Sequence, residues 1–297
     1  MNQEIAVDLQ GVTKKFGTQL AVDQLDLSVP QGCIYGMIGP NGSGKTTTIR
    51  MILRIYQPDQ GSVTVFGQSQ GTVADHRVGY LPEERGLYRR MTVRRVLRYF
   101  AKLKGVRRPD AIIDEQLERM GAKDWDRKRI EQLSKGMAQK IQFIVAVISK
   151  PQLVILDEPF SGLDPVNMEV LRDAVFELRK QGTTVLFSTH DMDMAERICD
   201  RVFMIDRGKK VLDGTLDAIK SGYGANVLRV RMANGGPVPF LDGVTHQAAF
   251  GSFFDLQLEY ETDRPKVLAR LAQHGDIEHF ETLRPSLHDI FVKIAKI

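Results

Sequence analysis

Long apolar runs are missing from this sequence of 297 residues. No stretch approaches the ~20 apolar residues that a helix needs to cross a bilayer, so we expect no membrane span. The first ten residues include acidic side chains and no long apolar segment, which is unlike a secretory signal. With 42% hydrophobic and 26% charged residues, the composition is typical of a soluble globular protein.

The sequence also has few cysteines and a small net charge. Cys33 and Cys199 are too few for a disulfide framework, which suits a reducing cytosol. The formal net charge of +4 gives no sign of a nucleic-acid-binding protein, and no nucleic-acid partner is expected. Basic residues are nevertheless concentrated at Arg85, Arg89, Arg90, Arg94, Arg95, Arg98, Lys102, Lys104, Arg107 and Arg108. Such a run is usually a solvated helix face, and the alternative is a docking surface for anionic lipid headgroups or an acidic partner.

The most specific pattern in the chain is a glycine-rich segment between a strand and a helix. Cys33 to Ile38 form a short apolar run, typical of a parallel strand buried on both faces. The next residues fit G-x-x-x-x-G-K-[ST] at every fixed position and continue into a helix; they are Gly39, Pro40, Asn41, Gly42, Ser43, Gly44, Lys45, Thr46 and Thr47. Glycines allow backbone N–H groups to point at phosphate oxygens, and the helix start adds further N–H groups. We therefore predict a nucleotide site in which Lys45 reaches the β- and γ-phosphates and Thr46 binds Mg²⁺.

Further apolar strands indicate an α/β core with a largely parallel sheet. Helical patterns separate Leu153–Asp157 from Thr183–Phe187, and a hairpin follows at Arg201–Asp213. In such sheets, ligands bind at the carboxyl ends of the strands. Asp157 and His190, like the glycine-rich segment, follow the end of a strand, so we expect all three in one crevice.

The periodicity of apolar residues also indicates two domains. Residues 1–221 contain every motif with a chemical role, and positions 86–150 within them are mainly helical in pattern. Short strands are indicated before the glycine-rich segment, at Ile5–Val7 and Leu25–Val29. Residues 222–297 show alternating strands and two helices, which predicts a small α+β domain.

Four motifs follow the glycine-rich segment in order. They are Leu133–Met137, Leu153–Glu158, Ser161–Asp164 and Ser188–His190. With them, the chain from about residue 5 to residue 213 resembles the ATP-binding cassette (ABC) superfamily. The resemblance implies a P-loop cassette with a parallel-sheet core, an antiparallel β subdomain and a helical subdomain. It also implies ATP and Mg²⁺ as cofactors, and a head-to-tail dimer with an identical or different cassette.

The resemblance assigns a role to each motif. Asp157 would bind Mg²⁺, and Glu158 would be the base for the attacking water, because neighbouring strand residues point to opposite faces. His190 would hold the γ-phosphate or that water. The other implied ATP contacts are Ser134, Lys135 and Gly136 of the signature motif, Asp164 of the D-loop, and Phe16 stacked on adenine. Without the resemblance, Phe16 would be read as an aromatic anchor in the core.

Three residues depart from the usual pattern of the superfamily. Lys135 and Met137 stand where the signature motif usually has Gly and Gln. Glu83 stands where Gln is usual; it can still bind Mg²⁺, but it adds negative charge near the γ-phosphate. With the small C-terminal domain, these variants resemble stand-alone ATPase subunits of prokaryotic exporters, notably the sodium-extrusion type.

The resemblance implies an ATPase subunit that drives a separately encoded membrane permease from the cytoplasmic face of the membrane, and the expected direction of transport is export. The first alternative is a soluble cassette ATPase that acts on DNA or ribosomes. The long coiled coils of repair-type members are missing between Thr47 and Leu133, and translation-factor members usually carry two cassettes. The second alternative, a regulator that does not hydrolyse ATP, is disfavoured by Glu158 and His190.

Overall fold

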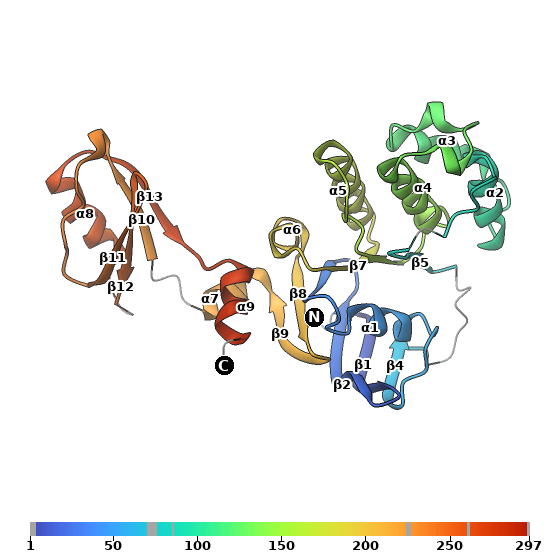
Figure 1. The fold of residues 1–297 in the computed structure, drawn as a ribbon, viewed down its shortest axis with the longest axis horizontal. Helices are drawn as coiled ribbons and strands as arrows, with labels where there is room; N and C mark the ends of the chain where they lie inside the picture. The colour runs from blue at the N-terminus through green and yellow to red at the C-terminus, as the bar shows by residue number, and fades with distance from the viewer. Residues whose placement is uncertain (1–3, 70–75, 85, 224–226, 260–261, 296–297) are drawn as a thin grey trace. The chain divides into compact units, whose positions relative to one another are not determined.

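The computed structural model describes residues 4–69, 76–84, 86–223, 227–259 and 262–295 (Figure 1). The chain divides into two compact units, Met1–Leu216 and Asp217–Ile297. The predicted boundary after residue 221 falls inside helix α7 (Leu216–Gly222), and the assignment of domains stays a prediction. None of the helices in the described residues is long and apolar enough to cross a membrane.

A six-stranded sheet forms the centre of the first unit. Its strands, in spatial order, are β5 (Val78–Leu81), β6 (Leu153–Asp157), β7 (Thr184–Thr189), β3 (Ile34–Ile38), β8 (Arg201–Asp206) and β9 (Lys209–Thr215). All are parallel except β9, which pairs with β8 as a hairpin. Every residue of β3, β6 and β7 is buried, which explains why these strands read as continuous apolar runs. The predicted parallel-sheet α/β core is confirmed.

An antiparallel sheet packs against this core. It contains β2 (Gln19–Pro30), β1 (Ile5–Phe16) and β4 (Gln60–Val65) in that order. Leu9 and Leu27 belong to the same buried cluster as Met37 of β3 and Ile49 of helix α1 (Lys45–Ile52). The end of β3 and the start of α1 are therefore held by packing from both sheets.

Helices make up the rest of the first unit. They are α2 (Val93–Leu103), α3 (Asp110–Arg119), the short η1 (Lys123–Trp125) and η2 (Ile130–Gln132), α4 (Lys135–Val147), α5 (Pro165–Lys180) and α6 (Met192–Ile198). In Figure 1, α2, α3 and α4 form one group, and β1, β2 and β4 form another. α2 contacts both α3 and α4, and α4 contacts β5. The predicted helical subdomain is thus joined to the sheet through α4.

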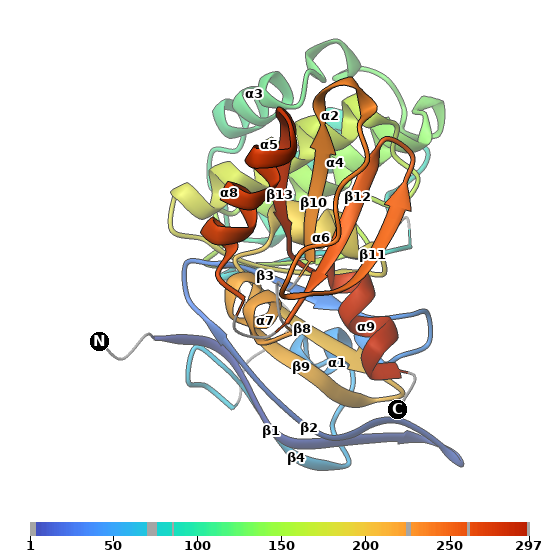
Figure 2. The same ribbon diagram turned by 90° about the vertical axis from the view of Figure 1, so that its left-hand side faces the viewer.

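The second unit has its own core. Its antiparallel sheet has the order β11 (Val244–Phe250), β12 (Phe253–Leu258), β10 (Val227–Met232) and β13 (Ile277–Leu283), visible in Figure 2. The other elements are η3 (Ala233–Gly235), α8 (Arg264–His274) and α9 (Leu287–Ala295). Leu228, Val230 and Leu256 from the sheet pack in one cluster with Val267 and Leu271 of α8. Alternate residues of β10 are buried, as the sequence pattern predicted, and the α+β class is confirmed.

Gly79 of β5 tests the contact between the helical subdomain and the sheet. A Cβ at this position would lie 2.1 Å from the backbone oxygen of Ala146 in α4. We expect Gly79→Ala to push α4 away from β5 and to lower the free energy of unfolding by about 1–3 kcal/mol. The control is Gly86→Ala, where a Cβ meets no atom within 4 Å. Equal thermal unfolding midpoints for the two variants would show that this contact is not tight.

Candidate nucleotide-binding site

The glycine-rich segment joins β3 to α1 in a conformation that few other residues can adopt. Gly42 and Gly44 have φ angles of 77° and 113°. At Gly39, a Cβ would lie only 2.1 Å from the backbone oxygen of Ile205 in β8. The backbone oxygen of Ser43 accepts a 2.8 Å hydrogen bond from the N–H of Gly208 in the β8–β9 turn. Close backbone packing against this hairpin therefore determines the shape of the loop.

Lys45 places a buried cation at this loop. Its side chain is 6% exposed, and its Nζ donates to the backbone oxygens of Gly39 at 2.7 Å and Pro40 at 3.2 Å. The same nitrogen lies 3.7 Å from Oε1 of Glu158. Burial lowers the pKa of Lys45, and Glu158 and Asp157 oppose this shift because they favour the charged form. The loop and the acidic end of β6 thus share one cation.

Asp157 lies at the end of β6 among hydroxyl groups. Its Oδ1 accepts hydrogen bonds from Oγ of Ser188 and, at 3.5 Å, from Oγ1 of Thr46. Its Oδ2 is buried and has no hydrogen-bond partner in the described part of the chain, and the same holds for Oγ of Ser43. Two buried polar atoms without partners at a phosphate loop fit a ligand with phosphate oxygens and a hard cation.

A magnesium ion fits this donor set. Mg²⁺ is usually bound by one or two protein oxygens, with phosphate oxygens and waters completing its coordination. The hydroxyl of Thr46 and the carboxylate of Asp157 are donors of that kind. Among the described residues, no cluster of three or more His, Cys, Asp and Glu side chains could hold a metal ion. Glu83 is exposed, and its charge is one of those that oppose the lowering of the Lys45 pKa. Within the described ranges, no hydrogen bond or ion pair places Glu83 at the end of β6.

The carboxylate of Glu158 lies beside His190. Nδ1 of His190 lies 3.0 Å from Oε1 and 3.1 Å from Oε2 of Glu158. The argument from strand alternation does not apply to this pair, because Glu158 lies outside the strand. β6 ends at Asp157, and Glu158 has a left-handed φ of 49°. The N–H of Glu158 donates to Oγ of Ser188 at 3.1 Å, which holds the start of this turn.

Ser188 is a residue whose role the sequence analysis missed. Its hydroxyl donates to Asp157 and accepts from the N–H of Glu158, so it connects both acidic residues. A signal was present in the sequence. Ser188 directly follows the predicted strand Thr183–Phe187 and comes two residues before His190. In the structure, the register of β6 and β7 pairs it with Asp157. A polar residue at the same level as an acidic strand end is a candidate partner for that acid.

The signature motif and the D-loop form a second group of predicted site residues. Ser134 caps α4, and its hydroxyl accepts from the N–H of Met137 at 3.3 Å. Asp164 caps α5 by accepting from the N–H of Asn167 at 3.0 Å. A Cβ on Gly162 would lie 2.2 Å from Nζ of Lys135, so the Lys135 ammonium lies against the D-loop. A Cβ on Gly136 would lie 3.1 Å from Nδ2 of Asn167, so the start of α4 also lies against α5.

Phe16 ends β1 and lies on the surface. It is 43% exposed, which excludes the reading of Phe16 as an anchor in the core. Its ring packs edge-on against Tyr56 at a centroid distance of 5.3 Å, and the ammonium of Lys14 lies 5.7 Å from its centroid. An exposed ring held in this way can offer its face to a planar base.

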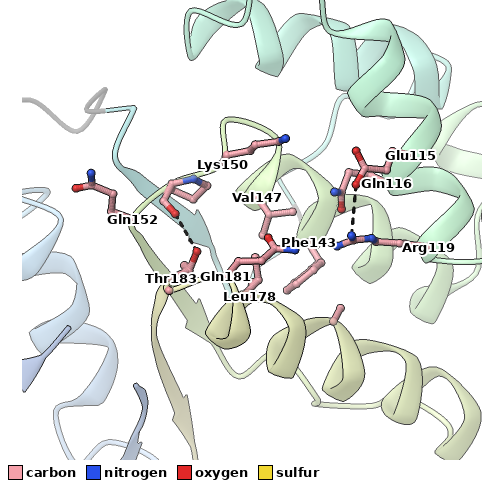
Figure 3. Close-up of a pocket in the computed structure, with 13 residues that line it drawn as sticks. Glu115, Gln116, Arg119, Phe143, Val147, Lys150, Gln152, Leu178, Gln181 and Thr183 are labelled. Carbon is pink, nitrogen blue, oxygen red and sulfur yellow. Dashed lines mark hydrogen bonds and ion pairs between the residues drawn. The ribbon is translucent and has the colours of Figure 1, made fainter. Parts of the chain in front are cut away.

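A different hollow lies at the amino ends of the strands. Its volume is about 410 Å³, and Figure 3 shows residues from α3, α4 and α5 around it. Gln152 and Thr183, which line it, precede β6 and β7, whereas the nucleotide residues follow the carboxyl ends of these strands. This hollow is therefore not part of the site described above.

Two family models match the chain. Residues 22–161 match the family described as ABC transporter. Residues 214–295 match the family described as ATP-binding protein DrrA1-3-like, C-terminal domain. The first match covers the part of the chain that carries the phosphate loop, and the second covers most of the second structural unit.

Similar proteins extend these matches over almost the whole chain. ABC transporter ATP-binding protein YhaQ of Bacillus subtilis is 43% identical over 287 residues, which cover 95% of this chain and 96% of YhaQ. Nod factor export ATP-binding protein I of Mesorhizobium japonicum is 32% identical over 299 residues, covering 98% of this chain and 87% of that protein. The solved structure of an ATP binding subunit of an ABC transporter matches with a TM-score of 0.67 and 29% identity, covering 74% of this chain and 93% of that one. The chain therefore belongs to the ABC transporter ATP-binding protein family, the ATP-hydrolysing cassettes of ABC transporters.

Proposed function

We propose that this chain powers a separately encoded membrane permease in an exporter, and that it works at the cytoplasmic face of the membrane through that permease. Export is supported by the relative from Mesorhizobium japonicum, which is named for Nod factor export. The names of the relatives favour transport over the alternative of a soluble ATPase that acts on nucleic acid or ribosomes. The narrower resemblance to sodium-extrusion subunits stays a prediction.

The observation that carries the proposal is the convergence of Lys45, Glu158 and His190 beside Asp157 and Thr46. The backbone N–H groups of residues 41–47 and the ammonium of Lys45 would bind the ATP phosphates. Thr46 and Asp157 would hold Mg²⁺, which neutralises charge on the β- and γ-phosphates when it is bound. Glu83 remains a candidate for the same ion through an intervening water.

Glu158 is the proposed general base. One of its Oε atoms would accept the proton of the water that attacks the γ-phosphate. His190 contacts both oxygens of Glu158 through Nδ1, so it can orient this carboxylate and hold the water or phosphate beside it. Nζ of Lys45 lies 3.7 Å from the same Oε1, so the carboxylate is close to two nitrogen groups.

The second group of residues supports a site shared between two subunits. Lys135 and Gly136 lie against the D-loop and α5, while Ser134 caps its own helix. Within the described residues, none of these contacts involves the phosphate loop. The start of α4 offers backbone N–H groups and the ammonium of Lys135, which suit a phosphate group. We propose that these residues and Asp164 act on ATP held by an opposing cassette, identical or different, while Phe16 stacks on the adenine of its own ATP.

The proposed domains follow from the same division of roles. Residues 1–221 would form the cassette, with the helical subdomain at about 86–150, and residues 222–297 the accessory domain. The match of residues 214–295 to a separate C-terminal family supports a division in this region.

The Glu158→Gln variant tests the base. The amide keeps the shape of the side chain but cannot take a proton from water, so we expect ATP turnover to fall by ~10²–10⁴-fold. Loss of a negative charge near the γ-phosphate should leave ATP binding intact or tighter, and an ATP-dependent dimer should accumulate. Steady-state phosphate release and size-exclusion chromatography with MgATP measure the two effects.

Glu118→Gln is the matched control for this experiment. Glu118 is an exposed residue of α3 whose carboxylate forms a surface ion pair with Lys123 at 2.8 Å, so the same chemical change should leave turnover unaltered. Normal turnover in Glu158→Gln would exclude Glu158 as the base. Slow turnover without an ATP-dependent dimer would argue against the shared site in the isolated subunit.

The Ser188→Ala variant tests whether the serine positions both acidic residues. We expect kcat to fall ~10-fold or more, because Asp157 and the N–H of Glu158 each lose a buried partner, a change of about 1–3 kcal/mol. Thr184→Val, at the other end of β7, removes a buried hydroxyl that accepts from the N–H of Gly32 at 3.0 Å. Turnover in Thr184→Val should stay near normal at a temperature where both variants are folded. Equal kcat values in the two variants would contradict a positioning role for Ser188.

A further inference from the structure

The structure divides the basic run of the helical subdomain into neutralised and free residues. Arg94 forms ion pairs with Asp126 and Asp114 at 2.5 Å and with Asp110 at 3.5 Å. Arg98 pairs with Asp110 at 2.6 Å. Arg85 lies outside the described residues. Other cations are exposed and have no acidic partner within the described ranges. They include Arg95, Lys102 and, from the loop after η1, Arg127.

These three cations border one hollow of about 680 Å³ on the helical subdomain. The hollow is lined by Thr92, Arg94, Arg95, Arg98, Tyr99, Lys102, Asp126 and Arg127. Five of these side chains are basic and one is acidic, and that one, Asp126, is already paired with Arg94. The hollow therefore concentrates positive charge that the protein itself does not neutralise.

Apolar side chains are exposed beside the same cations. Tyr99 is 38% exposed and Leu103 is 60% exposed, whereas Val93 and Leu97 on the inner face of α2 are fully buried. The Tyr99 ring is held by edge-on contacts with Tyr88 at 5.4 Å and with Phe100, so its exposed position is supported by packing. Basic residues beside exposed tyrosine and leucine are typical of surfaces that lie at the headgroup level of a membrane.

We propose that Arg95, Tyr99, Lys102, Leu103 and Arg127, here called the α2 surface, bind the headgroup region of a bilayer that contains anionic phospholipids. The free cations would contact lipid phosphates, and Tyr99 and Leu103 would lie at the boundary with the acyl chains. A dissolved phosphate or an acidic polypeptide would match the cations but would leave the exposed Leu103 without an apolar partner. This surface would hold the subunit at the membrane independently of its contacts with the proposed permease.

The test is sedimentation of the full chain with phosphatidylcholine vesicles that contain or lack phosphatidylglycerol. We expect binding to the anionic vesicles, and we expect it to weaken as salt is raised because the interaction is screened. Arg95→Gln, Lys102→Gln and Arg127→Gln together should lower the partition coefficient by about 10- to 100-fold. Leu103→Ser alone should lower it a few-fold and leave the salt dependence unchanged.

The matched control removes three exposed cations elsewhere in the same unit, with Lys180→Gln, Arg197→Gln and Lys210→Gln. This variant should bind as the unaltered chain does, and ATP turnover without vesicles should be normal in both triple variants. Equal loss in the two triple variants would show a response to net charge and overturn the proposal. Equal binding to neutral and anionic vesicles would also overturn the proposal. The same holds if the cations of the α2 surface bind inorganic phosphate or polyglutamate but the chain binds no vesicles. A single variant, Arg127→Gln, gives the same direction of change if the triple variant does not fold.

Discussion

The nucleotide site is built around a buried ammonium group, that of Lys45. Burying a charge costs several kcal/mol unless it is paired and hydrogen-bonded. Lys45 meets that condition through the carbonyls of Gly39 and Pro40 and through Glu158. Because the loop backbone holds the ammonium, the shape of the loop decides where the cation lies. That shape depends in turn on the close approach of Gly39 to β8 and on the hydrogen bond between Ser43 and Gly208.

The parallel sheet gathers the other groups around this cation. β3, β7 and β6 are neighbours, so the loop, His190 and the two acidic residues leave the sheet at one edge. Ser188 connects Asp157 with the turn at Glu158, and the left-handed backbone there directs the second carboxylate toward Lys45 and His190. The helical subdomain carries the signature motif at the start of α4 and, on α2, a separate basic surface. The nucleotide site and the proposed membrane-binding surface can therefore be altered by different residues of one unit.

Sequence patterns were most informative where the backbone itself restricts the choice of residue. Strands buried on both faces must be apolar throughout, so β3, β6 and β7 were predicted nearly at their observed positions. The pattern was less informative for β1 and β2, where only Ile5–Val7 and Leu25–Val29 were indicated. Both strands are 12 residues long, and irregularities in their pairing shift the register between Leu9 and Lys15. Each such shift interrupts the alternation of apolar and polar residues that reveals a strand.

The sequence by itself determined the phosphate loop, the order of the motifs and the family, because these depend on local geometry and on residue types close together in the chain. Only the tertiary structure decided the partners. It brings Ser188 to Asp157, places Lys135 against Gly162, and neutralises Arg94 with three aspartates while Arg95 stays exposed. Arg94 and Arg95 are adjacent and chemically identical, and they differ only in the side of α2 from which they project. Packing decides which acidic residue, many positions away in the chain, lies beside a given basic side chain. The periodicity of the sequence carries no information about that choice.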